Sequence, residues 1–265
     1  MLAGISTACL YPELTERALD TILRFGIQST ELFFNAFSEL NPNYLRELRQ
    51  RADDCGTRIL SIHPFTSAME PLLFFSGYYR RFEDGLEFYK QYFEAANLLG
   101  AEILVFHGDR REAQRPYESY FDRFAMLMES GRRMGVTVAQ ENVPRCASWQ
   151  PHFFEQMRRA LPQARFVLDV KQCLRGGFSA EEMAQAMGDG LIHVHLSDHC
   201  AGQDCLPIGK GDMNLPRLLQ QFRKQGFDGG VILELYRNNY RDFSELDESY
   251  RKILDAISKQ QALPE

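Results

Sequence analysis

Three carboxylates and one imidazole stand at the ends of four hydrophobic runs in the second half of the chain. They are Glu141 in VTVAQEN, Asp169 in RFVLDV, His195 in LIHVHLSD and Glu234 in GVILELY. Charged side chains are costly to place beside an apolar core unless they pair or bind a metal. A hard or borderline divalent cation favours carboxylate oxygens with one or two imidazoles. We therefore predict that this quartet binds one divalent metal ion and leaves positions open for substrate oxygens.

The elements that must position these residues alternate without a break along the chain. Short apolar runs, each bounded by loop residues, indicate buried strands, and amphipathic segments between them indicate helices. Helix signals include the Asn41-Pro42 start and the pair formed by Ser179 and Glu182, which is a capping box. The expected strands lie at 2–6, 29–34, 57–63, 101–107, 136–140, 165–169, 191–197 and 230–235.

Eight strand–helix units of this kind predict an α/β fold, a single (β/α)8 TIM barrel that spans residues 1–265. The chain has 265 residues, and such a barrel typically needs about 250. The alternative is an open, doubly wound sheet, but the phosphate-binding pattern G-x-G-x-x-G does not follow the first strand. In a barrel the chemistry sits at the carboxyl ends of the strands, which is where the quartet is expected.

Other polar residues stand at the same place on neighbouring strands. Glu31, His63 and His107 end the second, third and fourth strands. We predict that His63 and His107 bind substrate by hydrogen bonds, with a second metal ion as the alternative. His193 is expected to point away from the barrel interior. In the segment PIGKGD at 207–212, Lys210 is a candidate to bind an anionic or hydroxylated substrate, and a simple turn is the alternative.

The segment EPLLFFSGYYRRF at 70–82 is unusually aromatic for a loop beside the active rim. Rim loops of barrels exclude water from the chemistry, and a large exposed patch of rings invites association. We predict that Phe74 or Phe75 closes over the metal pocket or meets a second copy of the chain in a homo-oligomer. Packing against the segment's own helix is the alternative.

Composition limits the classes of partner. The net charge is −6, which gives nucleic acid little reason to bind. No apolar run approaches the roughly 20 residues that a membrane span needs, and the N-terminus lacks the pattern of a secretory signal. Six scattered cysteines without a C-x-x-C pair are typical of reduced thiols in a cytoplasmic protein.

Six motifs in this order resemble those of one known family, the xylose-isomerase-like barrels, which include sugar isomerases and epimerases, inosose dehydratases and type IV apurinic endonucleases. The resemblance covers essentially the whole chain. It implies that the quartet is the single-metal site of the isomerase branch and that Glu141 and Glu234 are also its acid/base pair. The motifs are HGD at 107–109, QEN at 140–142, LDV at 168–170, HVHLSD at 193–198, GKGD at 209–212 and LELY at 233–236.

Two departures separate the chain from the endonuclease branch. That branch has a His three residues after the Asp of the sixth strand, where this chain has Gln172, which we predict to contact substrate. It also has an Asp-x-His before the Gly-x-Gly loop, where this chain has Asp204, Cys205 and Leu206. Two ligands of a trinuclear zinc site are therefore missing.

These observations predict a metal-dependent isomerase or epimerase of a small sugar or polyhydroxylated carbonyl compound, acting by proton transfer through an enediolate. The expected cofactor is one Mn²⁺ or Mg²⁺ ion, with Co²⁺ or Zn²⁺ as alternatives. The same residues would serve a dehydratase of a related keto-polyol. Alternatives of other classes are an endonuclease and a barrel used only for binding.

Overall fold

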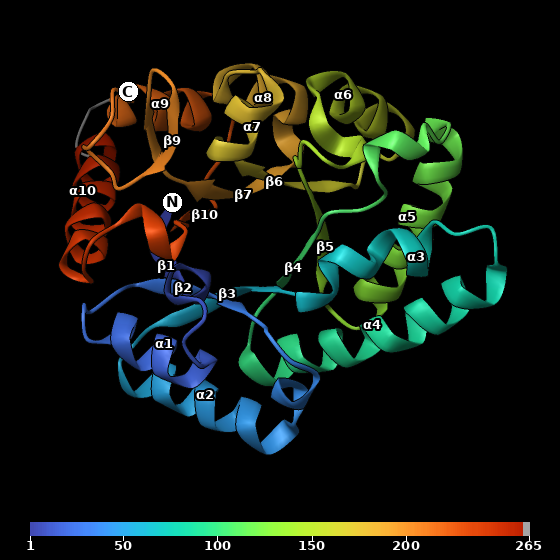
Figure 1. Cartoon of the computed structure of the whole chain (residues 1–265), viewed down its shortest axis with the longest axis horizontal. Helices are drawn as coiled ribbons and strands as arrows, with labels where there is room; N and C mark the ends of the chain where they lie inside the picture. Colours follow the sequence, from blue (N-terminus) through green and yellow to red (C-terminus); the bar gives the residue numbers. More distant parts are fainter. Residues whose placement is uncertain (262–265) are drawn as a thin grey trace.

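The computed structural model describes residues 1–261 and shows a closed barrel of parallel strands inside a ring of helices (Figure 1). The strands follow chain order around the barrel, and β10 closes it by pairing with β1. The predicted fold class is therefore confirmed. The barrel strands are β1 (Leu2–Ser6), β2 (Ser29–Phe33), β3 (Arg58–His63), β4 (Ile103–Phe106), β5 (Thr137–Glu141), β6 (Arg165–Asp169), β7 (Leu191–Leu196) and β10 (Gly230–Leu233).

The helices cover the outside of the barrel and connect successive strands. Two of them, α3 and α7, are additional short helices at the rim. The helices are α1 (Thr15–Leu23), α2 (Pro42–Asp54), α3 (Glu70–Phe74), α4 (Tyr79–Leu99), α5 (Tyr117–Arg133), α6 (Pro151–Ala160), α7 (Val170–Gly176), α8 (Ala180–Met187), α9 (Leu215–Lys224) and α10 (Ser244–Gln261).

Local signals in the sequence explain where several helices begin and end. The Asn41 side chain accepts hydrogen bonds from the first backbone N–H groups of α2, which starts with Pro42. Ser179 and Glu182 form the predicted capping box of α8. Gly100 ends α4 with a φ of 72°, a left-handed conformation that glycine adopts without strain. These caps fix the lengths of the connections that carry each strand to the rim.

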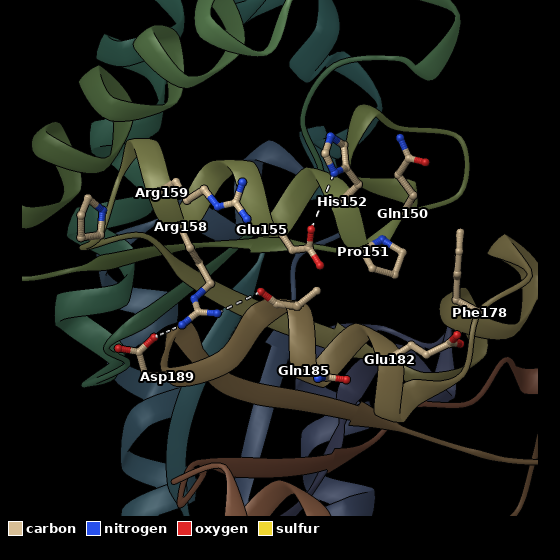
Figure 2. Close-up of a pocket in the computed structure, with 12 residues that line it drawn as sticks. Gln150, Pro151, His152, Glu155, Arg158, Arg159, Phe178, Glu182, Gln185 and Asp189 are labelled. Atoms are coloured by element: carbon tan, nitrogen blue, oxygen red, sulfur yellow. Dashed lines mark hydrogen bonds and ion pairs between the residues drawn. The ribbon is translucent and has the colours of Figure 1, made fainter.

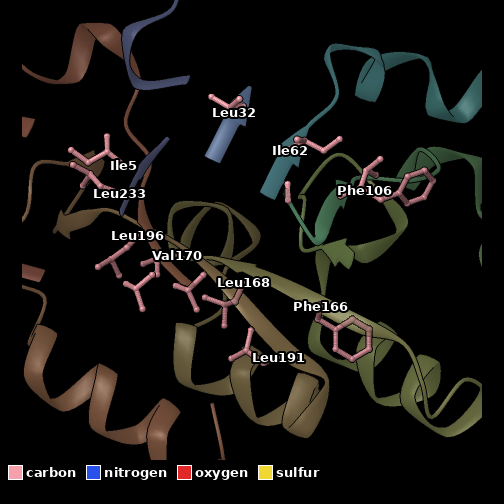
Figure 3. Packing of buried hydrophobic residues seen from close by; sticks show 14 of the residues in the cluster. Ile5, Leu32, Ile62, Phe106, Phe166, Leu168, Val170, Leu191, Leu196 and Leu233 are labelled. Atoms are coloured by element: carbon pink, nitrogen blue, oxygen red, sulfur yellow. The ribbon is translucent and has the colours of Figure 1, made fainter. Parts of the chain in front are cut away.

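Alternation along the strands sorts the side chains into two layers. Most outward positions are apolar and pack against the helices, as Ile5, Leu168, Leu196 and Leu233 show in Figure 3. The inward positions of three neighbouring strands form a separate small cluster inside the barrel. This cluster consists of Val105, Ala139 and Val167. Because side chains two residues apart share a face of a strand, the next inward positions are His107, Glu141 and Asp169.

Two segments outside the predicted strands and helices have regular structure. Residues 198–206 form a two-stranded antiparallel hairpin, β8 (Asp198–Cys200) and β9 (Gln203–Leu206), after strand β7. The aromatic segment 70–82 is α3 and the first turn of α4, joined by a short bend. Both lie on the connections that follow the carboxyl ends of strands, so both belong to the rim where the chemistry is expected.

Within residues 1–261 no helix is both long enough and apolar enough to cross a membrane. The six cysteines of this part of the chain are free thiols. Cys9, Cys146, Cys173 and Cys205 are buried.

Gly4 lies on β1 where the barrel wall leaves no room for a side chain. A Cβ atom there would lie 2.6 Å from Ile232 Cδ1 and 2.6 Å from Ser29 Oγ. We expect Gly4→Ala to lower the free energy of unfolding by about 1–3 kcal/mol, the usual cost of overpacking. Urea denaturation monitored by circular dichroism measures this. Gly77→Ala is the matched control, since no atom lies within 4 Å of its Cβ position, and equal losses in the two variants would contradict the explanation.

Candidate metal centre and its surroundings

The structure brings the predicted quartet together at the carboxyl ends of β5, β6, β7 and β10. Glu141, Asp169, His195 and Glu234 each offer one ligand atom, and these four atoms all lie within 4.8 Å of one another. The barrel register explains the convergence, because Asp169 of β6 pairs directly with His195 of β7. Three of the four side chains are almost fully buried, and the Glu234 side chain is 13% exposed.

The distances suit a divalent ion. His195 Nδ1 lies 3.1 Å from Glu141 Oε1, 3.5 Å from Glu234 Oε2 and 4.0 Å from Asp169 Oδ2. An ion with ligand bonds of about 2.0–2.2 Å keeps neighbouring ligand atoms roughly 3–4 Å apart. Three carboxylates and one imidazole are also the donor types that Mn²⁺ and Zn²⁺ accept. The residues present therefore fit a single divalent ion.

Glu31 of β2 orients the imidazole of His195. Its Oε2 atom lies 3.0 Å from His195 Nε2, and Ser61 donates a hydrogen bond of 2.7 Å to the same oxygen. A carboxylate behind a metal-binding imidazole fixes which ring nitrogen carries the proton and which faces the ion. With Nε2–H held by Glu31, Nδ1 is the atom that faces the quartet. Burial lowers the pKa of His195, but Glu31 and Glu234 raise it more, to well above its usual value.

His193 also points into the barrel, so the expectation that it points outward is wrong. Its Nε2 atom lies 3.1 Å from Ser61 Oγ and 3.4 Å from Glu31 Oε2, and its side chain is fully buried. Alternation of period two puts residues 193 and 195 on the same face of β7. His193 therefore belongs to the layer beneath the quartet, where it helps to hold Glu31.

His63 and His107 lie together on the other side of Glu141. The two Nε2 atoms lie 3.0 Å apart, and His107 Nε2 is 2.7 Å from Glu141 Oε2. Arg145 donates a hydrogen bond of 3.1 Å to His107 Nδ1. His63, His107 and Glu141 could themselves hold an ion, but a second ion would share Glu141 with the first. Hydrogen bonding to substrate stays our prediction for both histidines.

Glu70 of α3, which the sequence analysis did not single out, holds the backbone of His107 in place. Its carboxylate accepts hydrogen bonds from the backbone N–H groups of His107 (2.9 Å) and Gly108 (2.6 Å) and from the hydroxyl group of Tyr89 (2.8 Å). Glu70 is fully buried. These hydrogen bonds connect the start of the HGD motif to α3, which precedes it in the chain by one helix, α4, and one strand, β4.

Lys171 is the residue at the quartet that sequence reasoning missed. It lies on α7, two residues after Asp169, and its ammonium group forms ion pairs with Asp169 Oδ2 and Glu234 Oε2. Its side chain is 2% exposed. Burial lowers the pKa of Lys171, but the two carboxylates raise it well above its usual value, so the residue is a buried cation. The prediction relied on charged residues at the ends of buried strands, and it missed Lys171 because this residue lies on a helix.

The two other predicted substrate residues lie at different depths. Gln172 is half-buried beside the quartet, and its backbone N–H donates a hydrogen bond of 3.1 Å to Asp169 Oδ1. Lys210 is half-exposed, and its ammonium group lies 3.9 Å from Glu245 Oε1 of α10. The structure therefore brings Gln172 to the quartet and places Lys210 at the outer edge of the rim. Their contacts with substrate stay predictions.

Asp198 explains the GKGD motif. One oxygen of its buried carboxylate accepts hydrogen bonds from the backbone N–H groups of Gly209 (2.7 Å) and Gly211 (3.1 Å), and the other from those of His199 (2.7 Å) and Met213 (3.1 Å). The loop 207–213 is therefore wrapped around one carboxylate.

The hairpin β8–β9 is fixed against α7 by Arg175. Its guanidinium group pairs with Asp204 of β9, with the Nη2–Oδ1 distance at 3.0 Å, and donates a hydrogen bond of 2.9 Å to the Tyr236 hydroxyl group. The Tyr236 ring centre lies 5.7 Å from Lys171 Nζ. Hairpin, helix and Tyr236 together cover the side of the quartet where Lys171 enters.

Phe74 and Phe75 are packing residues, as the alternative interpretation of the aromatic segment proposed. Both are at most 3% exposed. Phe74 packs edge-on against Tyr89 with the ring centres 4.7 Å apart, and Phe75 stacks on Tyr120 at 4.5 Å. The prediction that these two rings cover the metal pocket is therefore wrong. The rings that remain exposed in this segment belong to Tyr78 and Tyr79.

A surface groove of about 780 Å³ lies between α6 and α8, outside the barrel (Figure 2). Two pairs of its polar residues contact each other. Arg158 contacts Asp189 at 2.8 Å, and His152 lies 3.7 Å from Glu155. Because no quartet residue lines this groove, it lies apart from the candidate metal centre.

A sequence model described as the xylose isomerase-like TIM barrel matches residues 19–260. The chain belongs to this family. The resemblance drawn from the motifs is thereby confirmed. One relative of this chain is an uncharacterized protein of Methanocaldococcus jannaschii. It is 24% identical over 276 residues, which cover 99% of this chain and 92% of the relative.

Solved structures of the same fold include sugar epimerases and a dehydratase. A D-tagatose 3-epimerase-like protein matches with a TM-score of 0.80 at 20% identity, over 99% of this chain and all of the other. A D-psicose 3-epimerase, solved in the presence of D-fructose, matches with 0.79 at 15%, over 96% and 97%. A probable 3-DHS dehydratase from Bacillus anthracis matches with 0.75 at 15%, over 97% and 99%. At these identities the likeness establishes the shared fold.

The buried carboxyl group of Glu70 gives a testable pH dependence. Burial raises the pKa of Glu70 from 4.5 to about 7. Between these values the folded protein holds a proton that the unfolded chain releases, so the contribution of Glu70 to the free energy of unfolding falls as the pH rises from about 5 to 7. Glu70→Gln imitates the protonated form and removes this dependence.

We expect the difference in unfolding free energy between Glu70→Gln and the wild type to grow in favour of the variant across this pH range, by roughly 1–3 kcal/mol. Urea unfolding at four pH values from 5 to 8 measures it, and subtraction cancels the other titrating groups. Parallel curves for the two proteins would contradict the raised pKa.

Proposed function

We propose that the protein is a metal-dependent isomerase or epimerase of a small sugar or polyhydroxylated carbonyl compound. The observation that carries the proposal is the position of two glutamates around His195 and Asp169. Glu141 comes from β5 and Glu234 follows β10, and two strands, β6 and β7, separate them around the barrel. Two carboxylates that approach one site from different sides suit a reaction in which one removes a proton and the other returns it.

The residues around each glutamate favour the ionised form that a base requires. Burial raises the pKa of Glu141, but His107 and His195 hold it well below its usual range. Burial likewise raises the pKa of Glu234, and Lys171 and His195 lower it more. Each carboxylate is thus in the ionised form that can accept a proton from a carbon beside a carbonyl group. Glu234 is the more exposed of the two, so it is the one that incoming substrate meets first.

The remaining residues bind and orient. His195, held by Glu31, and Asp169 complete the quartet with the two glutamates. A bound Mn²⁺ or Mg²⁺ ion would stabilise negative charge on the substrate oxygens next to the reacting carbon. His63 and His107 present imidazole groups beside Glu141, where they can hydrogen-bond further hydroxyl groups of the substrate. The buried position of the quartet keeps water away from an enediolate.

A dehydratase is the nearest alternative, since removal of the same proton can be followed by loss of a β-hydroxyl group. The structural likeness to a probable 3-DHS dehydratase favours keeping it. An endonuclease is a different class, which the family resemblance drawn from the motifs also includes. Gln172, Cys205 and the net charge of −6 argue against it. Product analysis separates the first two, and cleavage of abasic DNA that survives repeated purification would support the third.

Metal binding by the quartet can be tested without a substrate. We expect Asp169→Ala and His195→Ala each to abolish tight Mn²⁺ binding, because each removes one of the four converging ligands, while the barrel stays folded. Equilibrium dialysis with metal analysis measures the binding, and circular dichroism reports the fold. Asp189→Ala, which removes an exposed carboxylate on the outer surface, is the matched control. Unchanged metal content in both quartet variants would reject the assignment.

Proton transfer by the two glutamates predicts a specific isotope result. Incubation with ketohexoses that include D-fructose, D-psicose and D-tagatose in deuterated water should place deuterium on the reacting carbon of the product, which NMR detects. Glu141→Gln and Glu234→Gln should each lose roughly 10²–10⁴-fold in rate, and Glu129→Gln, an exposed control on α5, should not. Turnover without deuterium in the product would argue for hydride transfer and against this mechanism.

A further inference from the structure

Lys171 occupies a place that a metal ion would need. The oxygens to which its ammonium group donates are Asp169 Oδ2 and Glu234 Oε2. The same two oxygens face His195 Nδ1, at 4.0 Å and 3.5 Å. They are therefore the ligand atoms on one side of the quartet. An ion bonded to them at about 2.0–2.2 Å would compete with the ammonium group for these two oxygens, and the two positive charges would repel each other at close range.

The position of Lys171 in the backbone restricts the directions in which its side chain can point. Strand β6 runs directly into α7, and the Asp169 side chain caps this helix by accepting a hydrogen bond from the backbone N–H of Gln172. Lys171 is thus in the first turn of the helix, over the end of its own strand. Tyr236 lies above its ammonium group, and Arg175 holds Tyr236 in place by a hydrogen bond of 2.9 Å.

Charge explains why the ammonium group stays inside. Glu31, Glu141, Asp169 and Glu234 bring four carboxylates to this part of the barrel, and each lies within 4.0 Å of a ring nitrogen of His195. Two of the four, Asp169 and Glu234, also pair with Lys171. Removing a buried lysine from paired carboxylates leaves uncompensated negative charge, which is strongly unfavourable. The metal-free protein therefore needs a cation between Asp169 and Glu234, and Lys171 supplies one.

We propose that Lys171 is a built-in cation that replaces the metal ion at Asp169 and Glu234, so that the ion and the ammonium group exclude each other. The inference rests on the metal quartet of the proposed function. It means that metal binding includes displacement of Lys171, which weakens the affinity for the ion and keeps the metal-free barrel stable. Lys171 is in this sense a residue that sets metal occupancy, and no role in the proton-transfer step is assigned to it.

The test is Lys171→Met, which keeps the length of the side chain and removes its charge. Isothermal titration of the metal-free protein with Mn²⁺ should show an affinity about tenfold or more above that of the wild type, since a close buried charge no longer opposes the ion. Lys90→Met is the matched control. It removes the same charge from an exposed ion pair on α4 and should change the affinity less than about twofold.

Thermal unfolding gives a second readout that does not depend on activity. In EDTA, Lys171→Met should unfold at a lower temperature than the wild type, because Asp169 and Glu234 then repel each other. Added Mn²⁺ should raise the unfolding temperature of the variant by more than that of the wild type. If the variant is unfolded without metal, Mn²⁺ should restore its circular dichroism spectrum, and failure to do so overturns the proposal.

The outcomes separate this inference from the proposed function. If the wild type and Lys171→Met bind Mn²⁺ equally well, the exclusion is overturned while the metal quartet stands. If the variant binds Mn²⁺ more weakly, Lys171 organises the ligands and the proposal is also overturned. If neither protein binds Mn²⁺, both the exclusion and the metal-dependent function are rejected.

Discussion

Unbalanced negative charge inside the mouth of the barrel is the constraint that organises this protein. Four carboxylates, those of Glu31, Glu141, Asp169 and Glu234, lie where little water can reach them. Buried carboxylates persist only when cations or strong hydrogen-bond donors surround them. His195 lies between several of them, and Lys171 pairs with two. The polar contacts at this end of the barrel follow from the need to neutralise this cluster, with or without an ion.

The barrel meets this constraint through its register. Parallel strands bring equivalent positions to the same height, and alternation turns every second side chain inward. On β4, β5 and β6 the lower inward positions are apolar, namely Val105, Ala139 and Val167, and the next inward position on each of these strands is polar. On these three strands, the core and the chemistry are thus separated by one step, whereas β7 has the polar His193 in the lower layer. The apolar outer faces of the same strands pack under the helices and stay independent of the charged site.

Sequence alone was sufficient for the parts of the site that the strands carry. The ends of four buried strands identified Glu141, Asp169, His195 and Glu234, because a strand fixes both the height and the direction of each side chain. His193 was misplaced through an error in applying the same alternation. Lys171 was missed for a different reason. A lysine has a long flexible side chain, and its position on a helix after the strand does not reveal which carboxylates it will reach.

Contacts between distant segments were also beyond the sequence. Glu70 holds the N–H groups that begin the HGD motif, although a whole helix and strand lie between them, and nothing in its local pattern differs from a surface glutamate at a helix start. The pairing of Arg175 with Asp204 depends on the hairpin β8–β9, which the sequence analysis did not predict. Such contacts arise from how connections fold over the rim, which short-range periodicity does not describe.

The loop that surrounds Asp198 has a consequence for how such a barrel changes over evolutionary time. Its path is fixed by backbone N–H groups that converge on one carboxylate, with Gly209 and Gly211 at two of the four contacts. The side chain of Lys210 takes no part in that arrangement. Replacement of residue 210 therefore leaves these four hydrogen bonds intact, and the side chain at this exposed position can change without altering the path of the loop. A single aspartate thus gives this edge of the barrel freedom to diversify.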